Sequence, residues 1–75
     1  MIKKYYKIER KNIIVVQFIM EGYEGMATVS TLDARKAILA VSIMPDYISE
    51  VTGLLDYLQN KYPMQETNDD QGYKR

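Results

Sequence analysis

The small size of the chain limits its fold more than any other feature. The sequence has 75 residues and no cysteine, so we expect a single domain without disulfide bonds. Its stability must come from a small hydrophobic core. A domain of about 60 residues buries only about 60% of the surface that its unfolded chain exposes. Self-association is a common remedy where disulfides and metals are unavailable. The length therefore favours a homodimer.

The composition excludes several classes of function. Histidine is absent as well as cysteine, which removes serine–histidine catalysis, thiolate nucleophiles and the usual zinc sites. The glycine motifs that bind phosphates or dinucleotides are also absent. The longest apolar stretch, residues 13–20, is far shorter than the about 20 residues that a membrane span needs, and no signal-peptide pattern is present. We therefore expect a cytoplasmic protein that is not an enzyme and has no catalytic residues, metal, cofactor or membrane contact.

Three segments carry the alternating pattern of β-strands. Residues 2–9 alternate with an apolar face that only Lys4 interrupts. Residues 26–32 and 36–44 alternate in the same way and are joined by the short polar connection 33–35, which predicts a hairpin.

Two segments favour helices, the first less plainly than the second. In residues 12–21, four consecutive β-branched residues favour a strand, whereas Asn12 as an N-cap and Gly22 as a stop favour a helix. We predict a largely buried helix there. A clear apolar stripe between Pro45 and Pro63 predicts the second helix.

The order strand, helix, strand, strand, helix predicts an α+β fold. A right-handed crossover with the third strand inserted between the first two gives a ferredoxin-like β-α-β-β-α arrangement, with both helices on one face of a three-stranded antiparallel sheet. Residues 1–63 would form this single domain. Residues 64–75 lack apolar periodicity and predict a disordered polar tail, so the fourth strand of the fold would be missing. The first strand would then be an open edge.

Residues 21–33 carry the spacing Glu-Gly-Tyr-x-Gly-x-Ala-Thr-Val-x-Thr-x-Asp. Together with the residues before it, this motif resembles the core of a small bacterial family catalogued as domain of unknown function 4911. The resemblance covers about residues 2–61, supports a helix before Gly22 and implies no activity. The layout also resembles ACT regulatory domains, which bind amino acids between paired modules. That likeness is topological only, because residues 2–21 contain no glycine for a ligand-binding turn.

A first candidate surface follows from the charge distribution. Residues 1–11 hold five basic residues and one acidic residue, a net charge of +4, whereas residues 12–75 have a net charge of −4. Tyrosines between lysines are typical of surfaces that bind single-stranded nucleic acid. Alternatively, the lysines keep an edge strand from unwanted pairing. The predicted nucleic-acid or dimer surface comprises Lys3, Tyr5, Lys7, Thr28, Ser30 and Ser42.

The loop at residues 21–25 is a second candidate. Its glycines allow a ligand to approach the backbone closely, and its carboxylates could contact a small molecule or a cation. Alternatively, the glycines only shape the turn and the carboxylates are solvated. The predicted ligand-binding residues are Glu21, Gly22, Tyr23, Gly25 and Asp33.

Together these patterns predict an interaction or regulatory module. It would dimerise through the exposed sheet edge or face and bind a small ligand. The alternative function is single-stranded RNA binding through the basic first strand.

Overall fold

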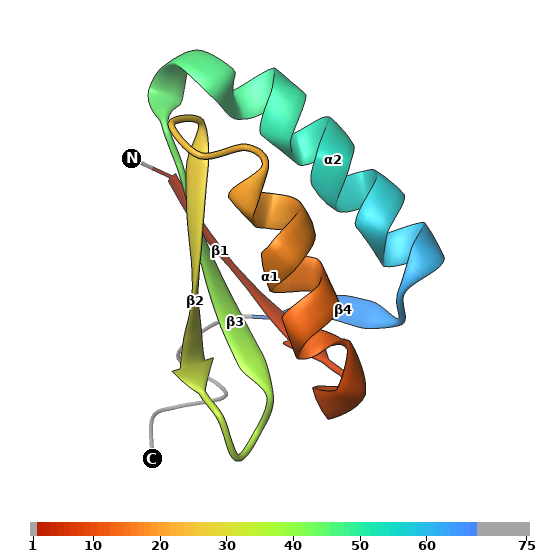
Figure 1. Ribbon diagram of the computed structural model, residues 1–75. Coiled ribbons are helices and arrows are strands. Elements are labelled where there is room, and N and C mark those ends of the chain that lie inside the picture. Colours follow the sequence, from red (N-terminus) through yellow and green to blue (C-terminus); the bar gives the residue numbers. More distant parts are fainter. Residues whose placement is uncertain (1, 68–75) are drawn as a thin grey trace.

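The computed structural model describes residues 2–67 and places two helices on one face of an antiparallel sheet (Figure 1). The elements in chain order are β1 (Ile2–Ile8), the 3₁₀ turn η1 (Arg10–Asn12), α1 (Ile13–Glu21), β2 (Ala27–Asp33), β3 (Ile38–Ile43), the 3₁₀ turn η2 (Pro45–Tyr47), α2 (Ile48–Lys61) and β4 (Met64–Thr67). The predicted α+β class and the order of the first five elements are confirmed.

The sheet has four strands in the order β2-β3-β1-β4, all antiparallel to their neighbours. This element order and strand order are compatible with the ferredoxin-like fold. The prediction of three strands with a missing fourth is wrong, because residues 64–67 pair with β1 from Ile8↔Met64 to Tyr5↔Thr67. The rest of the predicted tail, residues 68–75, lies outside the described residues.

The position of β4 makes β1 a central strand and not the open edge that the sequence predicts. It also explains why Lys4 interrupts the apolar face of β1. Lys4 lies on the face that the helices cover, where its Nζ is 3.2 Å from Glu66 Oε2 on β4. A lysine at this position is tolerated because the neighbouring strand supplies its counter-charge.

The core lies between the helices and the sheet. It combines alternate residues of the strands with one stripe from each helix. Its buried members are Tyr6, Ile8, Val16, Met20, Ala27, Leu39, Val41, Ile43, Val51, Leu55, Leu58 and Met64. Leu39, Val41 and Ile43, at alternate positions of β3, therefore face the helices.

The ambiguous segment forms a helix, α1, which ends where predicted, immediately before Gly22. Two details differ from the prediction. The side chain of Asn12 makes no capping hydrogen bond. The helix is also not largely buried, because Ile14 is 78% exposed and Phe18 is 72% exposed. A single short helix lying on a small sheet can bury only the stripe that faces the sheet, so apolar residues on the other side remain in contact with solvent.

The second helix, α2, follows a 3₁₀ turn that Pro45 opens, and it buries Val51, Leu55 and Leu58 as its pattern predicts. A Cβ added at Gly53 would meet no atom within 4 Å, so close packing does not account for this glycine. Within residues 2–67, neither helix has the length and apolar character that crossing a membrane requires.

Candidate functional site

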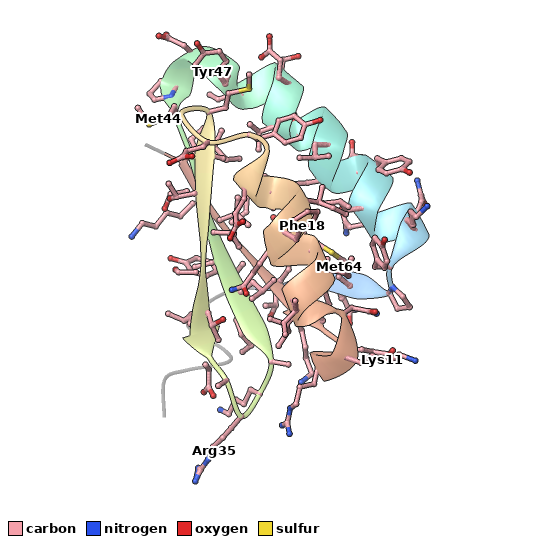
Figure 2. All side chains as sticks on the ribbon, in the orientation of Figure 1. Lys11, Phe18, Arg35, Met44, Tyr47 and Met64 are labelled. Atoms are coloured by element: carbon pink, nitrogen blue, oxygen red, sulfur yellow. The ribbon has the colours of Figure 1, made fainter. Side chains whose placement is uncertain are left out.

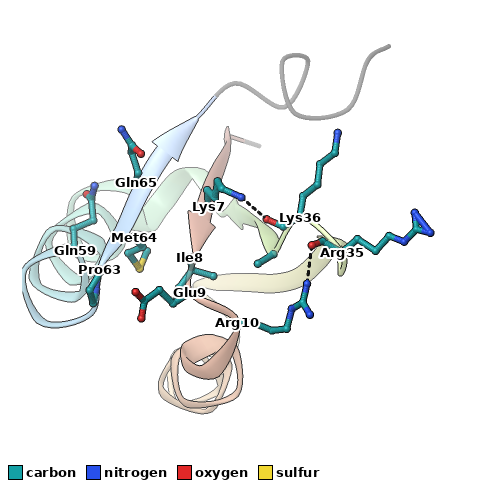
Figure 3. A pocket seen from close by; sticks show the side chains of 11 residues that line it. Lys7, Ile8, Glu9, Arg10, Arg35, Lys36, Gln59, Pro63, Met64 and Gln65 are labelled. Carbon is teal, nitrogen blue, oxygen red and sulfur yellow. Dashed lines mark hydrogen bonds between the residues drawn. The ribbon is translucent and has the colours of Figure 1, made fainter.

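An open cavity of roughly 770 Å³ lies where β1 ends, between the β2–β3 hairpin and the start of β4 (Figure 3). Its lining holds four basic residues and one acidic residue, a net charge of +3. The lining residues are Lys7, Ile8, Glu9, Arg10, Arg35, Lys36, Ala37, Gln59, Pro63, Met64 and Gln65. We call this cavity the basic pocket.

The hairpin that forms one wall of the basic pocket has a defined backbone shape. The Asp33 carboxylate accepts a hydrogen bond from the Lys36 backbone N–H at 3.1 Å, and the strand register shifts between Thr31 and Asp33. Ala37 has a φ of +57°, a left-handed conformation that costs an L-residue roughly 1–2 kcal/mol. The carbonyl of Ala37 accepts a hydrogen bond from the Ile8 N–H at 3.0 Å, which fastens the hairpin to β1.

Two cationic side chains are fixed to this hairpin. Lys7 Nζ donates to the Lys36 carbonyl at 2.9 Å, and Arg10 Nη2 donates to the Arg35 carbonyl at 2.9 Å (Figure 3). An ammonium group has three donors and a guanidinium group has five, so each side chain uses one donor for its anchor. A carbonyl orients a cation without cancelling its charge. Both groups therefore keep charge and donors for a further acceptor.

A second cavity, of roughly 460 Å³, lies along the outer side of β2 beneath α1. Its charged lining residues are Glu21 and Glu24, so its character is opposite to that of the basic pocket. Gln17 Nε2 donates to Thr31 Oγ1 at 3.1 Å, which ties this flank of α1 to β2. We call this cavity the acidic groove.

The structure brings together only some of the predicted ligand residues. Glu21 lines the acidic groove. Gly22 follows α1 with an ordinary φ of −69°, whereas Gly25 has a φ of +94° and needs the freedom of glycine. Tyr23 contributes its carbonyl, which accepts the Met26 N–H at 2.9 Å in this turn.

Asp33 does not join these residues. It lies at the far end of β2 from the loop. Six residues of extended chain separate it from the start of the strand, which corresponds to about 20 Å. The described residues contain no group of three or more carboxylates that could hold a metal ion. A ligand site in the loop remains a prediction, and Asp33 instead shapes the wall of the basic pocket.

The residues of the predicted nucleic-acid or dimer surface do lie together. Lys3, Ser42 and Thr28 form one row across β1, β3 and β2, and Tyr5 and Ser30 belong to the next row on the same face. The helices cover the opposite face (Figure 1). Because β1 is central, its lysines do not protect an edge, which removes the structural explanation that the sequence allowed for them.

Sequence reasoning missed the cationic partners of Lys7. Arg10 contributed to the positive charge of residues 1–11, but its link to Arg35 and Lys36 depends on the pairing of β1 with β3. The consecutive basic residues 35 and 36 in the predicted hairpin were the available signal. Without a strand register, nothing connected them to the end of β1.

One titratable group in the core is strongly perturbed. Burial raises the pKa of the Tyr6 hydroxyl to about 12, and the negative charges of Glu66 and Asp56 act in the same direction. Tyr6 therefore stays neutral at physiological pH, and its phenol serves the core between β1, β4 and α2.

The protein is therefore a small α+β module with two cavities, and the order of its elements is compatible with the ferredoxin-like fold. The chain belongs to the family Domain of unknown function (DUF4911), whose model matches residues 6–61. The matched segment contains α1, the hairpin and β2, and it confirms the family resemblance of the motif at residues 21–33. No curated protein and no solved structure matches the chain.

Proposed function

We propose that the protein acts in the cytoplasm as a homodimeric interaction or regulatory module and performs no catalysis of its own. Two copies would join side by side through β2 and the adjoining flank of α1. The observation that carries this proposal is the outer edge of β2. Within residues 2–67 no strand pairs with it, and positions 27–32 contain neither charge nor proline to discourage pairing.

The flank of α1 beside this edge continues the surface. Gln17 lies on the flank of α1 that faces β2, as its bond to Thr31 shows. Ile14 and Glu21 are its neighbours on the outward side of that flank by helical spacing. Ile14 and the adjacent Phe18 are the most exposed large apolar side chains of the described residues. Figure 2 shows Phe18 on the outside of α1. Clustered apolar side chains of this kind mark interaction surfaces.

A second copy fits this surface through two-fold symmetry. Two β2 strands related by a two-fold axis run antiparallel, which would join the two four-stranded sheets into one of eight strands. The charges agree with this arrangement. Arg10 and Lys11 precede α1, whereas Glu21 ends the helix and Glu24 follows it, so each acidic end would lie beside the basic end of the partner. The antiparallel helix dipoles add to the same attraction.

The predicted ligand loop would lie at this interface. The acidic groove, with Glu21 and Glu24, opens along β2, so a ligand bound there would contact both subunits. This agrees with the likeness to paired ACT-like modules that the sequence suggests. A ligand for the groove would carry a positive charge, because carboxylates are its charged groups.

The test is a charge substitution on the flank of α1. If the two-fold axis lies near Gln17, Ile14 of one copy faces Glu21 of the other. Ile14→Glu would then place two carboxylates opposite each other, and their repulsion should weaken the dimer at least tenfold. Adding Glu21→Lys should restore it by converting that repulsion into attraction. Sedimentation equilibrium over micromolar concentrations measures each dissociation constant, and thermal unfolding checks that each variant folds.

Tyr57→Glu is the matched control. Tyr57 is also an exposed large side chain, at 56%, but it lies on α2, which packs against β4 at the opposite edge of the sheet from β2. The control should leave the dimer intact. A wild-type chain that stays monomeric, or a control that dissociates as readily as Ile14→Glu, would overturn the proposed interface.

A further inference from the structure

We infer that the basic pocket at the end of β1 is a binding site for the phosphate groups of an anionic ligand. The inference is independent of the proposed dimer, because the pocket lies between the β2–β3 hairpin and the start of β4. Its first support is charge. Four basic side chains and one carboxylate line a single open cavity in a chain whose total charge is zero.

The second support is the state of the cations. In the part of the chain that the structure describes, Lys7, Arg10 and Arg35 form no ion pair with a carboxylate. Lys7 and Arg10 are instead held by carbonyls of the hairpin, in a geometry that leaves most of their donors unused. Phosphate oxygens are strong acceptors for such groups, and the planar guanidinium suits them particularly well. A pre-oriented cation also loses less conformational freedom when a ligand binds.

The acidic member of the lining does not cancel this charge. Glu9 Oε1 is 3.7 Å from Lys11 Nζ, and Lys11 lies outside the lining. The carboxylate therefore has a cation of its own. An incoming phosphate would meet a net positive field, which attracts anions over a distance of about one Debye length.

The cations continue from the pocket onto the open face of the sheet. Lys7 belongs to both surfaces, and Tyr5 and Lys3 follow it at alternate positions of β1, about 7 Å apart. Tyr5 is half-buried between them, with its ring on the face opposite the helices. A chain of repeated phosphates could follow this path while a base stacks on the tyrosine. We therefore expect a single-stranded oligonucleotide to bind more tightly than a small phosphate compound.

The experiment compares two probes, inorganic pyrophosphate and a short single-stranded oligonucleotide, by calorimetric titration at low salt. Lys7→Gln combined with Arg10→Gln should weaken binding of both probes at least tenfold. A plot of the logarithm of the oligonucleotide binding constant against the logarithm of the salt concentration should also become less steep. The slope should fall by about 0.7 for each phosphate that the variant no longer neutralises. Lys61→Gln is the matched control, because it removes the same type of charge on α2 outside the lining.

Because Lys7 and Arg10 also hold the hairpin, replacing them could weaken binding by disturbing the fold. A variant that is expected to tighten binding excludes this explanation. Glu9→Gln leaves both anchors intact and removes the carboxylate of the lining, so it should tighten binding of both probes. Tyr5→Ala distinguishes the sources of phosphate. A loss for the oligonucleotide alone supports nucleic acid, whereas equal binding of both probes without a tyrosine effect supports a small phosphorylated molecule.

Two results would overturn the inference. One is the failure of both probes to bind at low salt. The other is a Lys61→Gln variant that weakens binding of both probes as much as the double variant does. In the second case the total charge of the chain, and not the pocket, would determine the affinity.

Discussion

The two edges of the sheet differ in length, charge and means of attachment. β2 has seven residues, pairs with β3 along its length and is uncharged from Ala27 to Leu32. β4 has four residues, pairs with β1 at four positions and carries Glu66. Short, charged edges resist further pairing, whereas long, uncharged edges invite it. By this rule the β4 edge discourages the addition of a further strand, whereas the β2 edge favours it.

The attachment of the two edges differs as much as their exposure. Backbone pairing over many residues holds β2 in place, supported by the bond from Gln17 to Thr31. β4 has fewer backbone pairs and depends on side chains. Met64 packs in the core, and Glu66 forms an ion pair with Lys4. Substitutions can measure how far each edge relies on its side chains.

The largest effect is expected for Met64→Ala. Truncating a buried methionine leaves a cavity and costs about 2–5 kcal/mol, and Met64 is the buried residue of β4. Val29→Ala on β2 should cost less, because Val29 is half-buried and its strand has more backbone pairs. Urea unfolding measures both. An equal loss for the two variants would contradict the view that β4 alone depends on its side-chain anchor.

The second effect concerns alkaline pH and the core beneath β4. The pKa of Tyr6 rises from 10.0 to about 12 on folding, so the unfolded chain ionises first as the pH increases. The resulting stabilisation is complete below pH 10 and is lost between pH 10 and about 12, by about 2–3 kcal/mol in total. Tyr6→Phe should therefore flatten the fall of unfolding free energy over this range. The other tyrosines are present in both the wild type and Tyr6→Phe, so their contributions cancel when the unfolding free energies of the two proteins are subtracted.

Glu66→Gln refines this measurement. Removing the carboxylate of β4 should narrow the pH range over which stability is lost, because Glu66 contributes to the shift. Burial is the larger cause, so part of the range should remain. If Glu66→Gln had the full effect of Tyr6→Phe, charge and not burial would set the pKa of Tyr6.

The smallest effect compares one substitution at two glycines. Gly25 has a φ of +94° in the turn that leads into β2, and a Cβ there would touch nothing within 4 Å. Gly25→Ala should therefore cost roughly 1–2 kcal/mol through backbone strain alone. Gly53→Ala also enters open space but lies within a helix, so it should stabilise the protein by about 0.5–1 kcal/mol. If both substitutions stabilised the protein, the turn at residue 25 would have to accommodate an alanine without backbone strain.

The sequence predicted the first five elements because each has a strong local signal. Alternation revealed β1, β2 and β3, and the stripe that contains Val51 and Leu58 revealed α2. The burial of α1 was overestimated, since its apolar residues surround the helix while the sheet can cover only one side. Ile14 and Phe18 are apolar but exposed on the outer side of α1. A local pattern of apolar residues does not distinguish such exposed positions from core positions.

The fourth strand could not be predicted from local pattern alone. It has one buried residue, Met64, among polar neighbours, and it forms because β1 offers an unpaired edge. The informative signal was Lys4 on the apolar face of β1, which required an acidic neighbour from elsewhere in the chain. The basic pocket was missed for a similar reason. Its cations come from β1, η1 and the hairpin, and only the strand register brings them together.

The pairing of β4 with β1 also determines how the molecule could assemble if it were cut. Cleavage before Met64 would release the edge of β1 while β2 stayed open, so each subunit would present two different unpaired edges. Contacts between unlike edges need not close on themselves, and where they do not close they propagate into filaments. In the proposed dimer, the four residues of β4 would thus act as a terminator that limits assembly to two copies.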